Sequence, residues 1–354
     1  MSFNEGTGAA ERRPAGPFFY ITKLRAVSCI AVVILHTALA AAGSFEMTDT
    51  QRMWTMLLRN LMLWSVPCFI MVTGALLLSP AHGMDYRKLF GRYIARMVLC
   101  ILLFTAVFEL FDVILTGEEP GLWILGEYAL KVIAGRSWSH MWYLYMLVGL
   151  YLLLPFYRMI AARAEKRDLL YLLGVYFVFL SVLPMLREVF DSDIAFFVCV
   201  SGIYPFFLFA GHLIHSGTAK IRRGMLWILL LISTGLLAAA TAAAYLAPSE
   251  LLQSLLGTYA FPPTVIQSVC VFGLFSEYGS GERGIRVWKG IDRCSFGVYL
   301  IHMLFLKLLY VGFGFDPYAH GGTALLIPVA AGVFAVSFLA SAAMKVIPGL
   351  KRLI

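Results

Sequence analysis

The pattern of apolar and polar positions divides the chain into ten long apolar segments joined by short polar connections. Segments of roughly twenty apolar residues are long enough to cross the hydrocarbon core of a bilayer as helices. Several contain glycine or proline, which membrane bundles tolerate because neighbouring helices satisfy the freed backbone groups. The pattern predicts an all-α, polytopic membrane bundle of about ten transmembrane helices. The segments lie near residues 19–43, 53–78, 93–115, 141–161, 169–186, 195–214, 225–247, 262–277, 294–313 and 323–347.

Two regions fall outside these segments. Residues 1–17 show no periodic pattern of apolar side chains, so we expect a mobile cytoplasmic tail there. The long connection 116–139 contains an amphipathic stretch, 123–134, with Glu127 and Lys131 on its polar side. This stretch predicts an interfacial helix or a partly re-entrant element, with a plain surface helix as the alternative. No linker is long enough to separate two domains, so residues 18–354 are expected to form one transmembrane domain.

Arginine and lysine gather at alternate ends of the predicted spans, on one side of the membrane. The excess of basic residues in short loops marks the cytoplasmic side, which places both termini in the cytoplasm. The net charge of +8 therefore follows from topology and does not indicate nucleic-acid binding. Of the 28 basic residues, those that fall on the other side are Arg52, Arg59, Lys131, Arg136, Arg187 and Lys307.

Composition supports the membrane class. Hydrophobic residues make up 60% of the chain and charged residues only 14%, whereas soluble domains carry about a quarter charged residues. The six cysteines form no CxxC pair, and nearly all lie in apolar segments, so we expect reduced, buried thiols. Arg12-Arg13, the apolar run after them and the alanine-rich stretch 38–42 also resemble a cleaved export signal. Cleavage would break the charge alternation, which favours a retained first span.

The first apolar segment contains an arginine and a histidine, Arg25 and His36. In a helix, His36 lies ~16 Å along the axis from Arg25. That position is about halfway across a ~30 Å hydrocarbon core. An ionisable group at this depth normally faces a protein interior or a wet cavity and marks function. The alternative is a structural histidine, hydrogen-bonded between packed helices.

The third segment begins with two arginines, Arg92 and Arg96, on one helical face. Together with Arg25 they predict a site at the cytoplasmic edge for a phosphate-bearing ligand whose reactive end reaches His36. As the alternative, these arginines are ordinary topology anchors. Glu109 and Asp112 lie further along the same segment.

Further polar candidates lie in the fourth and ninth segments. His140, Trp142 and Tyr143 open the fourth, and His302 lies within the ninth. With Glu109, these four are the candidate substrate-binding residues. The alternatives are an aromatic belt at the outer boundary for residues 140–143 and a simple ion pair for Glu109. His212 and His215 have the spacing of a helical metal site but no third ligand nearby in the sequence, so no metal is predicted.

Several of these residues belong to motifs that follow one another in a known order. Arg25 followed by Ala26, with His36 in the same span, resembles the first-span signature of the integral-membrane acyltransferase-3 family. Residues 66–78, 140–151 and 295–302 resemble the second-, fourth- and ninth-span patterns of that family. The resemblance covers about residues 19–347, and the nearest branch comprises stand-alone O-acetyltransferases that modify bacterial surface glycans.

The resemblance implies an activity. Family members transfer an acyl group, usually acetyl, from cytoplasmic acyl-CoA to a hydroxyl of a cell-surface polysaccharide or lipid-linked glycan, in the bacterial inner membrane and without a metal. By position, His36 would be the catalytic base or a transient acyl carrier. Arg25 would bind the CoA phosphates or position His36. The third-span motif of the family has two arginines separated by two residues. Arg92 and Arg96 are separated by three, so which of them matches stays open.

A second function class remains as an alternative. A glycan transporter or exporter could use His36 and Glu109 as proton-relay residues. Such transporters often consist of two related halves with broken helices in matching places, and no such repeat is evident in this sequence. Release of the acyl group from acyl-CoA by the purified protein separates the two classes.

Overall fold

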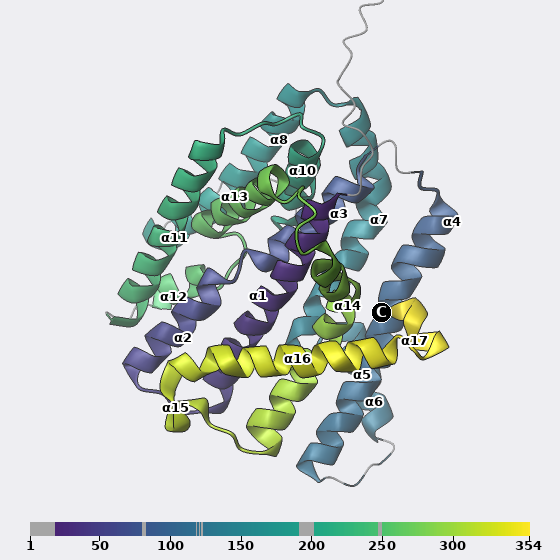
Figure 1. Ribbon diagram of the computed structural model, residues 1–354, viewed down its shortest axis with the longest axis vertical. Helices are drawn as coiled ribbons and strands as arrows, with labels where there is room; N and C mark the ends of the chain where they lie inside the picture. The colour runs from purple at the N-terminus through teal and green to yellow at the C-terminus, as the bar shows by residue number, and fades with distance from the viewer. Residues whose placement is uncertain are drawn as a thin grey trace, which may run out of the picture.

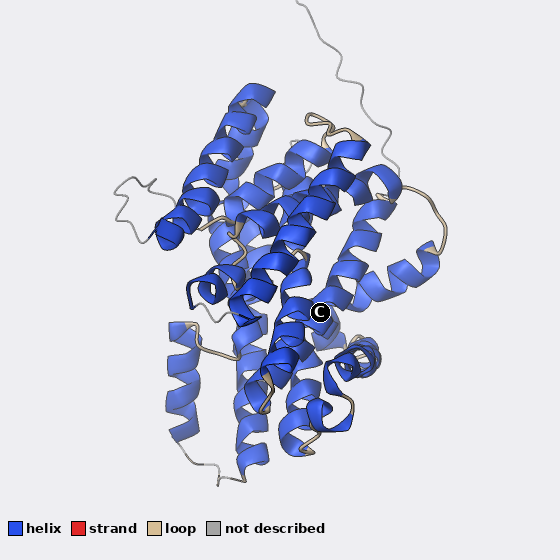
Figure 2. Ribbon diagram, turned by 90° about the vertical axis from the view of Figure 1, so that its left-hand side faces the viewer, coloured by secondary structure: helices blue, strands red, loops and turns tan. Residues whose placement is uncertain are grey.

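The computed structural model describes residues 18–79, 83–117, 119, 121, 123–190, 202–246 and 250–354. In these ranges the chain forms helices and loops without a strand, which confirms the all-α class (Figure 2). The predicted tail and Cys199 lie outside the described residues. The helices are α1 (Phe19–Ser44), α2 (Asp49–Leu61), α3 (Ser65–Leu77), α4 (Tyr86–Lys88), η1 (Leu89–Ile94), α5 (Ala95–Thr116), α6 (Trp123–Ala134), η2 (Ser139–Met141), α7 (Trp142–Arg163), α8 (Lys166–Phe177), η3 (Val178–Val182), α9 (Leu183–Phe190), α10 (Tyr204–His215), α11 (Arg223–Leu246), α12 (Glu250–Leu256), α13 (Pro262–Tyr278), α14 (Ile285–Lys307), η4 (Leu308–Gly312), α15 (Pro317–His320), η5 (Gly322–Leu325), α16 (Leu326–Met344) and α17 (Pro348–Leu353).

Eight stretches among the described residues are long and apolar enough to cross a membrane. Two further predicted segments correspond to α10, with 12 residues, and α13, with 17. The polytopic bundle is thus confirmed, while the count of ten and the cytoplasmic position of the termini remain predictions. The eight stretches are Phe19–Ser44, Asp49–Leu77, Tyr86–Thr116, Trp123–Arg163, Lys166–Val189, Arg223–Leu246, Ile285–Gly312 and Gly322–Met344.

Helix α1 lies in the middle of the bundle, and α16 crosses in front of it (Figure 1). Helix α1 also packs against α2, α3, α13 and α14. A helix with apolar side chains on every side is usually buried among other helices. Helix α1 accordingly has buried residues along most of its length. His36 is therefore carried into the protein interior, where only 8% of its surface is exposed.

The second predicted span is broken into α2 and α3 by a turn at residues 62–64. Thr48 and Gln51 begin α2 with a capping box, in which each side chain accepts a hydrogen bond from the other residue's backbone N–H. Pro67 lies in the first turn of α3, where a backbone N–H has no intrahelical partner to lose. The break leaves Arg59 in the last turn of α2.

Helices α3 and α10 cross with their backbones in direct contact. A Cβ atom on Gly74 would lie 1.8 Å from the Leu208 carbonyl oxygen, and one on Gly211 would lie 2.0 Å from the Met71 carbonyl oxygen. Small residues allow this approach, which membrane helices use because lipid provides no hydrophobic drive for their association. The contact fixes the part of α3 that lines the cavity described below.

We expect Gly74→Ala to destabilise the protein by more than the 1–3 kcal/mol typical of overpacking, because backbone atoms cannot move aside as a side chain can. Thermal unfolding in detergent measures this. Gly235→Ala is the matched control, since a Cβ on the exposed Gly235 of α11 meets nothing within 4 Å. Equal melting temperatures for the two variants would contradict the close packing of α3 on α10.

The third span begins with the π-helical segment η1, which contains Arg92 and leads into α5. A helix at 123–134 is confirmed with the predicted bounds, and this helix, α6, runs back along α5. Tyr128 of α6 donates a hydrogen bond from its hydroxyl to the Leu102 carbonyl, at 3.1 Å. Helix α6 therefore covers part of the α5 surface beside the cavity.

Candidate functional site

Two histidines from distant parts of the chain meet in the centre of the bundle. Helices α1 and α14 pack side by side, and Nδ1 of His36 lies 3.0 Å from Nε2 of His302. His302 has no exposed surface. Nδ1 of His302 lies 3.0 Å from the carbonyl oxygen of Val298, one turn earlier in α14.

These contacts determine which ring nitrogens carry protons. A carbonyl oxygen only accepts, so Nδ1 of a neutral His302 must donate to Val298 and Nε2 must be the acceptor. His36 then donates from Nδ1 to His302. The proton sites are thereby assigned from the network, and Nε2 of His36 is left with its lone pair. That atom is available as a base or a nucleophile.

A third imidazole, His140, closes the same region. Its ring centroid lies 5.4 Å from that of His302 and 6.3 Å from that of His36. Nε2 of His140 is 3.3 Å from the Leu300 carbonyl oxygen, while Nδ1 is buried without a hydrogen-bond partner among the described residues. The hydroxyl of Tyr299 donates to the His140 backbone carbonyl. Both α14 contacts hold His140 against the His36–His302 pair.

His36 and His140 face a cavity of about 420 Å³. Trp142 and Tyr143 line it as well, which favours a role in the site over an aromatic belt at the outer boundary. His302 does not line the cavity and lies behind His36. The predicted site residues that line it are Arg25, His36, Arg92, Arg96, His140, Trp142 and Tyr143.

The three arginines line the cavity together. Arg25 and His36 lie on the same face of α1, because eleven residues are about three helical turns. Arg25 pairs with Asp292 of α14, with Nε 3.2 Å from Oδ1. Arg96 donates from Nε to the Leu353 carbonyl at 2.7 Å and lies over the Phe296 ring, 4.9 Å from its centroid. Arg92 is exposed.

Positive charge is in excess at this end of the cavity. Among the described residues, neither Arg92 nor Arg96 has a carboxylate partner, so Asp292 balances only one of the three guanidinium groups. Uncompensated arginines around an opening favour an anionic, phosphate-bearing ligand. Sequence reasoning missed Asp292, which lies two residues before the predicted ninth segment and is the one carboxylate of α14.

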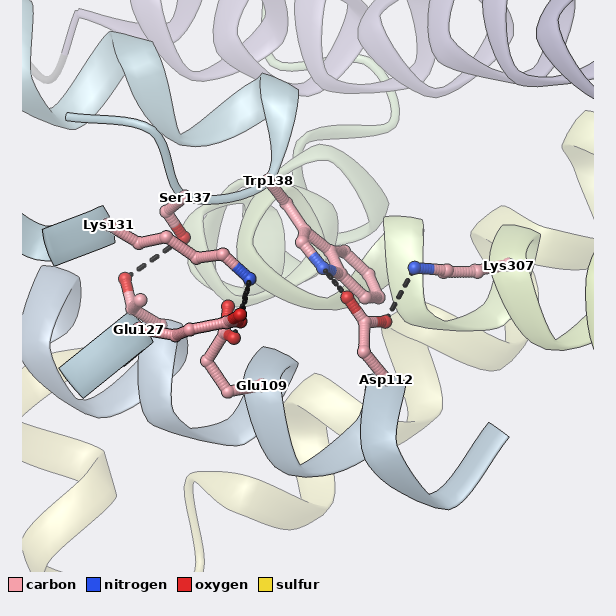
Figure 3. A network of polar contacts seen from close by, with 8 residues as sticks. Glu109, Asp112, Glu127, Lys131, Ser137, Trp138 and Lys307 are labelled. Atoms are coloured by element: carbon pink, nitrogen blue, oxygen red, sulfur yellow. Dashed lines mark hydrogen bonds and ion pairs between the residues drawn. The ribbon is translucent and has the colours of Figure 1, made fainter. Parts of the chain in front are cut away.

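Glu109, predicted as a substrate-binding residue, does not line the cavity. Its Oε2 accepts from Lys131 Nζ at 2.6 Å, and Lys131 also lies 3.5 Å from Glu127 Oε2 (Figure 3). The fold of α6 along α5 brings Lys131 to Glu109, which the sequence pattern could not indicate. The structure thus shows Glu109 in an ion pair with Lys131, which was the alternative to a substrate-binding role.

The neighbouring part of this network supports the wall behind His140. Asp112 accepts from Lys307 Nζ at 2.5 Å and from the Trp138 indole N–H at 2.9 Å (Figure 3). The Trp138 ring stacks on Phe108, with centroids 4.4 Å apart, and Phe108 lies 5.4 Å from His140. Ion pairs on one side thus hold an aromatic stack against the histidine cluster on the other.

Metal-ligating geometry is not found in the described part of the chain, where no group of three or more His, Cys, Asp or Glu residues is arranged to hold an ion. Of the two histidines with the spacing of a helical metal site, His215 forms a hydrogen bond through Nδ1 with the Tyr20 hydroxyl, at 2.5 Å. The cysteines at 29, 68, 100, 270 and 294 are free and buried.

A family model described as an acyltransferase domain, that of the acyltransferase-3 family, matches residues 18–345. The chain belongs to the acyltransferase-3 family. Neither a curated protein nor a solved structure matches the chain. Membership makes this protein a multi-pass membrane acyltransferase and gives no support to the transporter alternative.

The match to the acyltransferase-3 family covers all the residues of the histidine cluster and of the cavity. The resemblance inferred from Arg25, His36 and the later motifs is therefore confirmed at the level of the family. Helix α17, which supplies the Leu353 carbonyl to Arg96, lies beyond the matched residues. That contact therefore joins the matched domain to a helix beyond it.

Proposed function

We propose that this acyltransferase moves an acyl group, preferentially acetyl, from cytoplasmic acyl-CoA to a hydroxyl of a cell-surface polysaccharide or lipid-linked glycan in a bacterial inner membrane. The observation that carries the proposal is one cavity that joins three arginines to the free Nε2 of His36. The donor, the acceptor and the membrane lipids are the partners this requires.

The shape of the donor fits the cavity. CoA has phosphates at one end of an extended pantetheine arm and the reactive thioester at the other. Arg25 and His36 are ~16 Å apart along α1, and apolar side chains such as Val32 and Phe69 line the space with them. Phosphates at the arginines would therefore place the thioester near His36, and the apolar wall would limit its hydrolysis.

The chemistry needs a group that activates a poor nucleophile. In one route, Nε2 of His36 takes the hydroxyl proton as the hydroxyl oxygen attacks the thioester carbon, the C–S bond breaks, and the imidazole returns the proton to the thiolate. In the other, Nε2 attacks the thioester carbon itself, the thiolate leaves, and the hydroxyl displaces the imidazole while its proton passes to the thiolate. In both, His302 accepts the Nδ1–H bond that orients His36.

The overall activity is tested with purified protein in detergent, radiolabelled acetyl-CoA and a lipid-linked glycan fraction. We expect label to move into the glycan as an alkali-labile ester. Absence of saturable acetyl-CoA binding by folded protein at millimolar concentration would overturn the proposal. Transport by reconstituted vesicles of an unmodified glycan, without loss of acetyl-CoA, would favour the transporter instead.

Arg92→Gln and Arg96→Gln are each expected to raise the KM for acetyl-CoA about tenfold, because each removes a charge-assisted contact with a phosphate. Steady-state kinetics at several salt concentrations measure this, and the variants should also lose part of the salt dependence. Acetyl-pantetheine, which has no phosphate, should show the same KM with the variants as with the wild type.

Arg87→Gln is the matched control, since Arg87 is exposed at the same end of the protein and does not line the cavity. Its KM for acetyl-CoA should equal that of the wild type. A rise in KM for acetyl-pantetheine as large as that for acetyl-CoA would show that the two arginines act on the fold and not on the phosphates.

A further inference from the structure

Arg59 is a partly buried cation at the end of α2, among the six basic residues away from the basic side. Its Nη1 donates to the Asn60 side-chain oxygen at 3.0 Å, and its Nη2 donates to the Gly257 carbonyl at 3.3 Å. Its Nε–H is buried without a hydrogen-bond partner among the described residues. The guanidinium group thus has donors left to offer.

Among the described residues, Arg59 has no carboxylate partner. Arginine removed from water is normally paired with a carboxylate, because the desolvation of an unpaired charge is costly. A cation without a counter-ion in the part of the chain that the structure describes indicates that a ligand supplies the negative charge.

The position of this guanidinium group is set in advance by neighbouring buried groups. Asn60 is 1% exposed and donates from Nδ2 to Thr241 Oγ1 at 3.0 Å, which turns its oxygen towards Arg59. Thr241 in turn donates to the Leu237 carbonyl at 2.8 Å. A chain of satisfied hydrogen bonds therefore holds the cation in place before any ligand binds.

Arg59 lies beside the cavity but does not line it. Its Nη2 contact is with Gly257, two residues before Tyr259, which lines the cavity together with His36. The Tyr259 ring lies against Trp142, with centroids 5.4 Å apart. Arg25, Arg92 and Arg96 serve the donor in the proposed function, so Arg59 is a separate cation near the place where the acceptor must present its hydroxyl.

We propose that Arg59 binds an oxyanion of the acceptor, a carboxylate or a phosphate, so that the acceptor is an acidic or phosphorylated glycan. This inference rests on the proposed function and specifies its substrate class. The guanidinium fork matches the two oxygens of either group, and the aromatic pair Trp142 and Tyr259 provides flat apolar surfaces of the kind that stack on sugar rings.

The test compares binding of radiolabelled methyl glucuronide, glucose 6-phosphate and neutral methyl glucoside to the purified full chain by equilibrium dialysis. Wild type is expected to bind one of the two anions at least tenfold more tightly than the glucoside. The preferred anion distinguishes a carboxylate acceptor from a phosphate acceptor. Arg59→Gln should lose this preference, and Arg59→Lys should keep part of it.

Arg52→Gln is the matched control, because Arg52 is exposed on the same helix and its removal changes the net charge equally. It should bind all three probes as the wild type does. If wild type binds the anions no better than the glucoside, the inference is wrong, even if Arg59→Gln does not fold. It is also wrong if folded Arg59→Gln keeps the preference.

Acetyl-CoA binding measured in the same preparations separates the two proposals. Acetyl-CoA binding without any anion preference overturns only the role of Arg59. Loss of acetyl-CoA binding in the wild type overturns the proposed function, whatever the glucuronide result.

Discussion

His36→Ala is expected to abolish acyl transfer while leaving the protein folded and able to bind acetyl-CoA. Nε2 of His36 is the nitrogen that the hydrogen-bond network leaves with a free lone pair facing the cavity. General base catalysis contributes about 10²–10⁴-fold, and loss of an acyl carrier removes its route entirely. A fall in turnover of at least about a thousandfold is therefore expected.

Release of label from radiolabelled acetyl-CoA measures this turnover, and binding of the same ligand reports the fold. His320→Ala is the control, since His320 is an exposed histidine that does not line the cavity. A folded His36→Ala protein with wild-type turnover would falsify the assignment. Rapid quenching without acceptor then separates the two routes, because only an acyl carrier leaves label on the wild-type protein.

The second large effect is expected from His302, a positioning residue behind His36. His302→Phe keeps an aromatic ring but removes the acceptor that His302 offers to Nδ1–H of His36, so that His36 is less firmly oriented. We expect kcat to fall about a hundredfold. The KM for acetyl-CoA should not change, because His302 does not line the cavity.

His302→Gln provides the matched comparison, since its side-chain oxygen can accept the hydrogen bond that phenylalanine cannot. Its kcat should be clearly higher than that of His302→Phe. Equal losses in the two variants, or a rise in KM as large as the fall in kcat, would mean that His302 supports packing and does not orient His36.

The sequence predicted the parts of this structure that depend on local order along the chain. Apolar segments of membrane-spanning length identified the helical class, and the first of them placed Arg25 and His36 in one span. The bounds of α6 followed from its amphipathic pattern. Such features depend on helix geometry and on side-chain hydrophobicity, which each residue carries wherever the chain folds.

Contacts between helices that are distant in the sequence could not be predicted from these local patterns. The histidines of the His36–His302 pair are 266 residues apart, and only the packing of α1 on α14 reveals that one orients the other. Packing between helices also pairs Glu109 with Lys131 and Asp292 with Arg25. Helical periodicity gives the face on which a residue lies but not the neighbour that this face meets.

The sequence by itself thus determined that the chain is a helical membrane bundle with an arginine and a histidine in its first span. The tertiary structure alone decided which charges are neutralised. Asp292 pairs with Arg25, whereas Arg59 meets only neutral groups among the described residues. The physical reason is that pairing acts over a few ångströms, and only the folded chain brings distant residues that close.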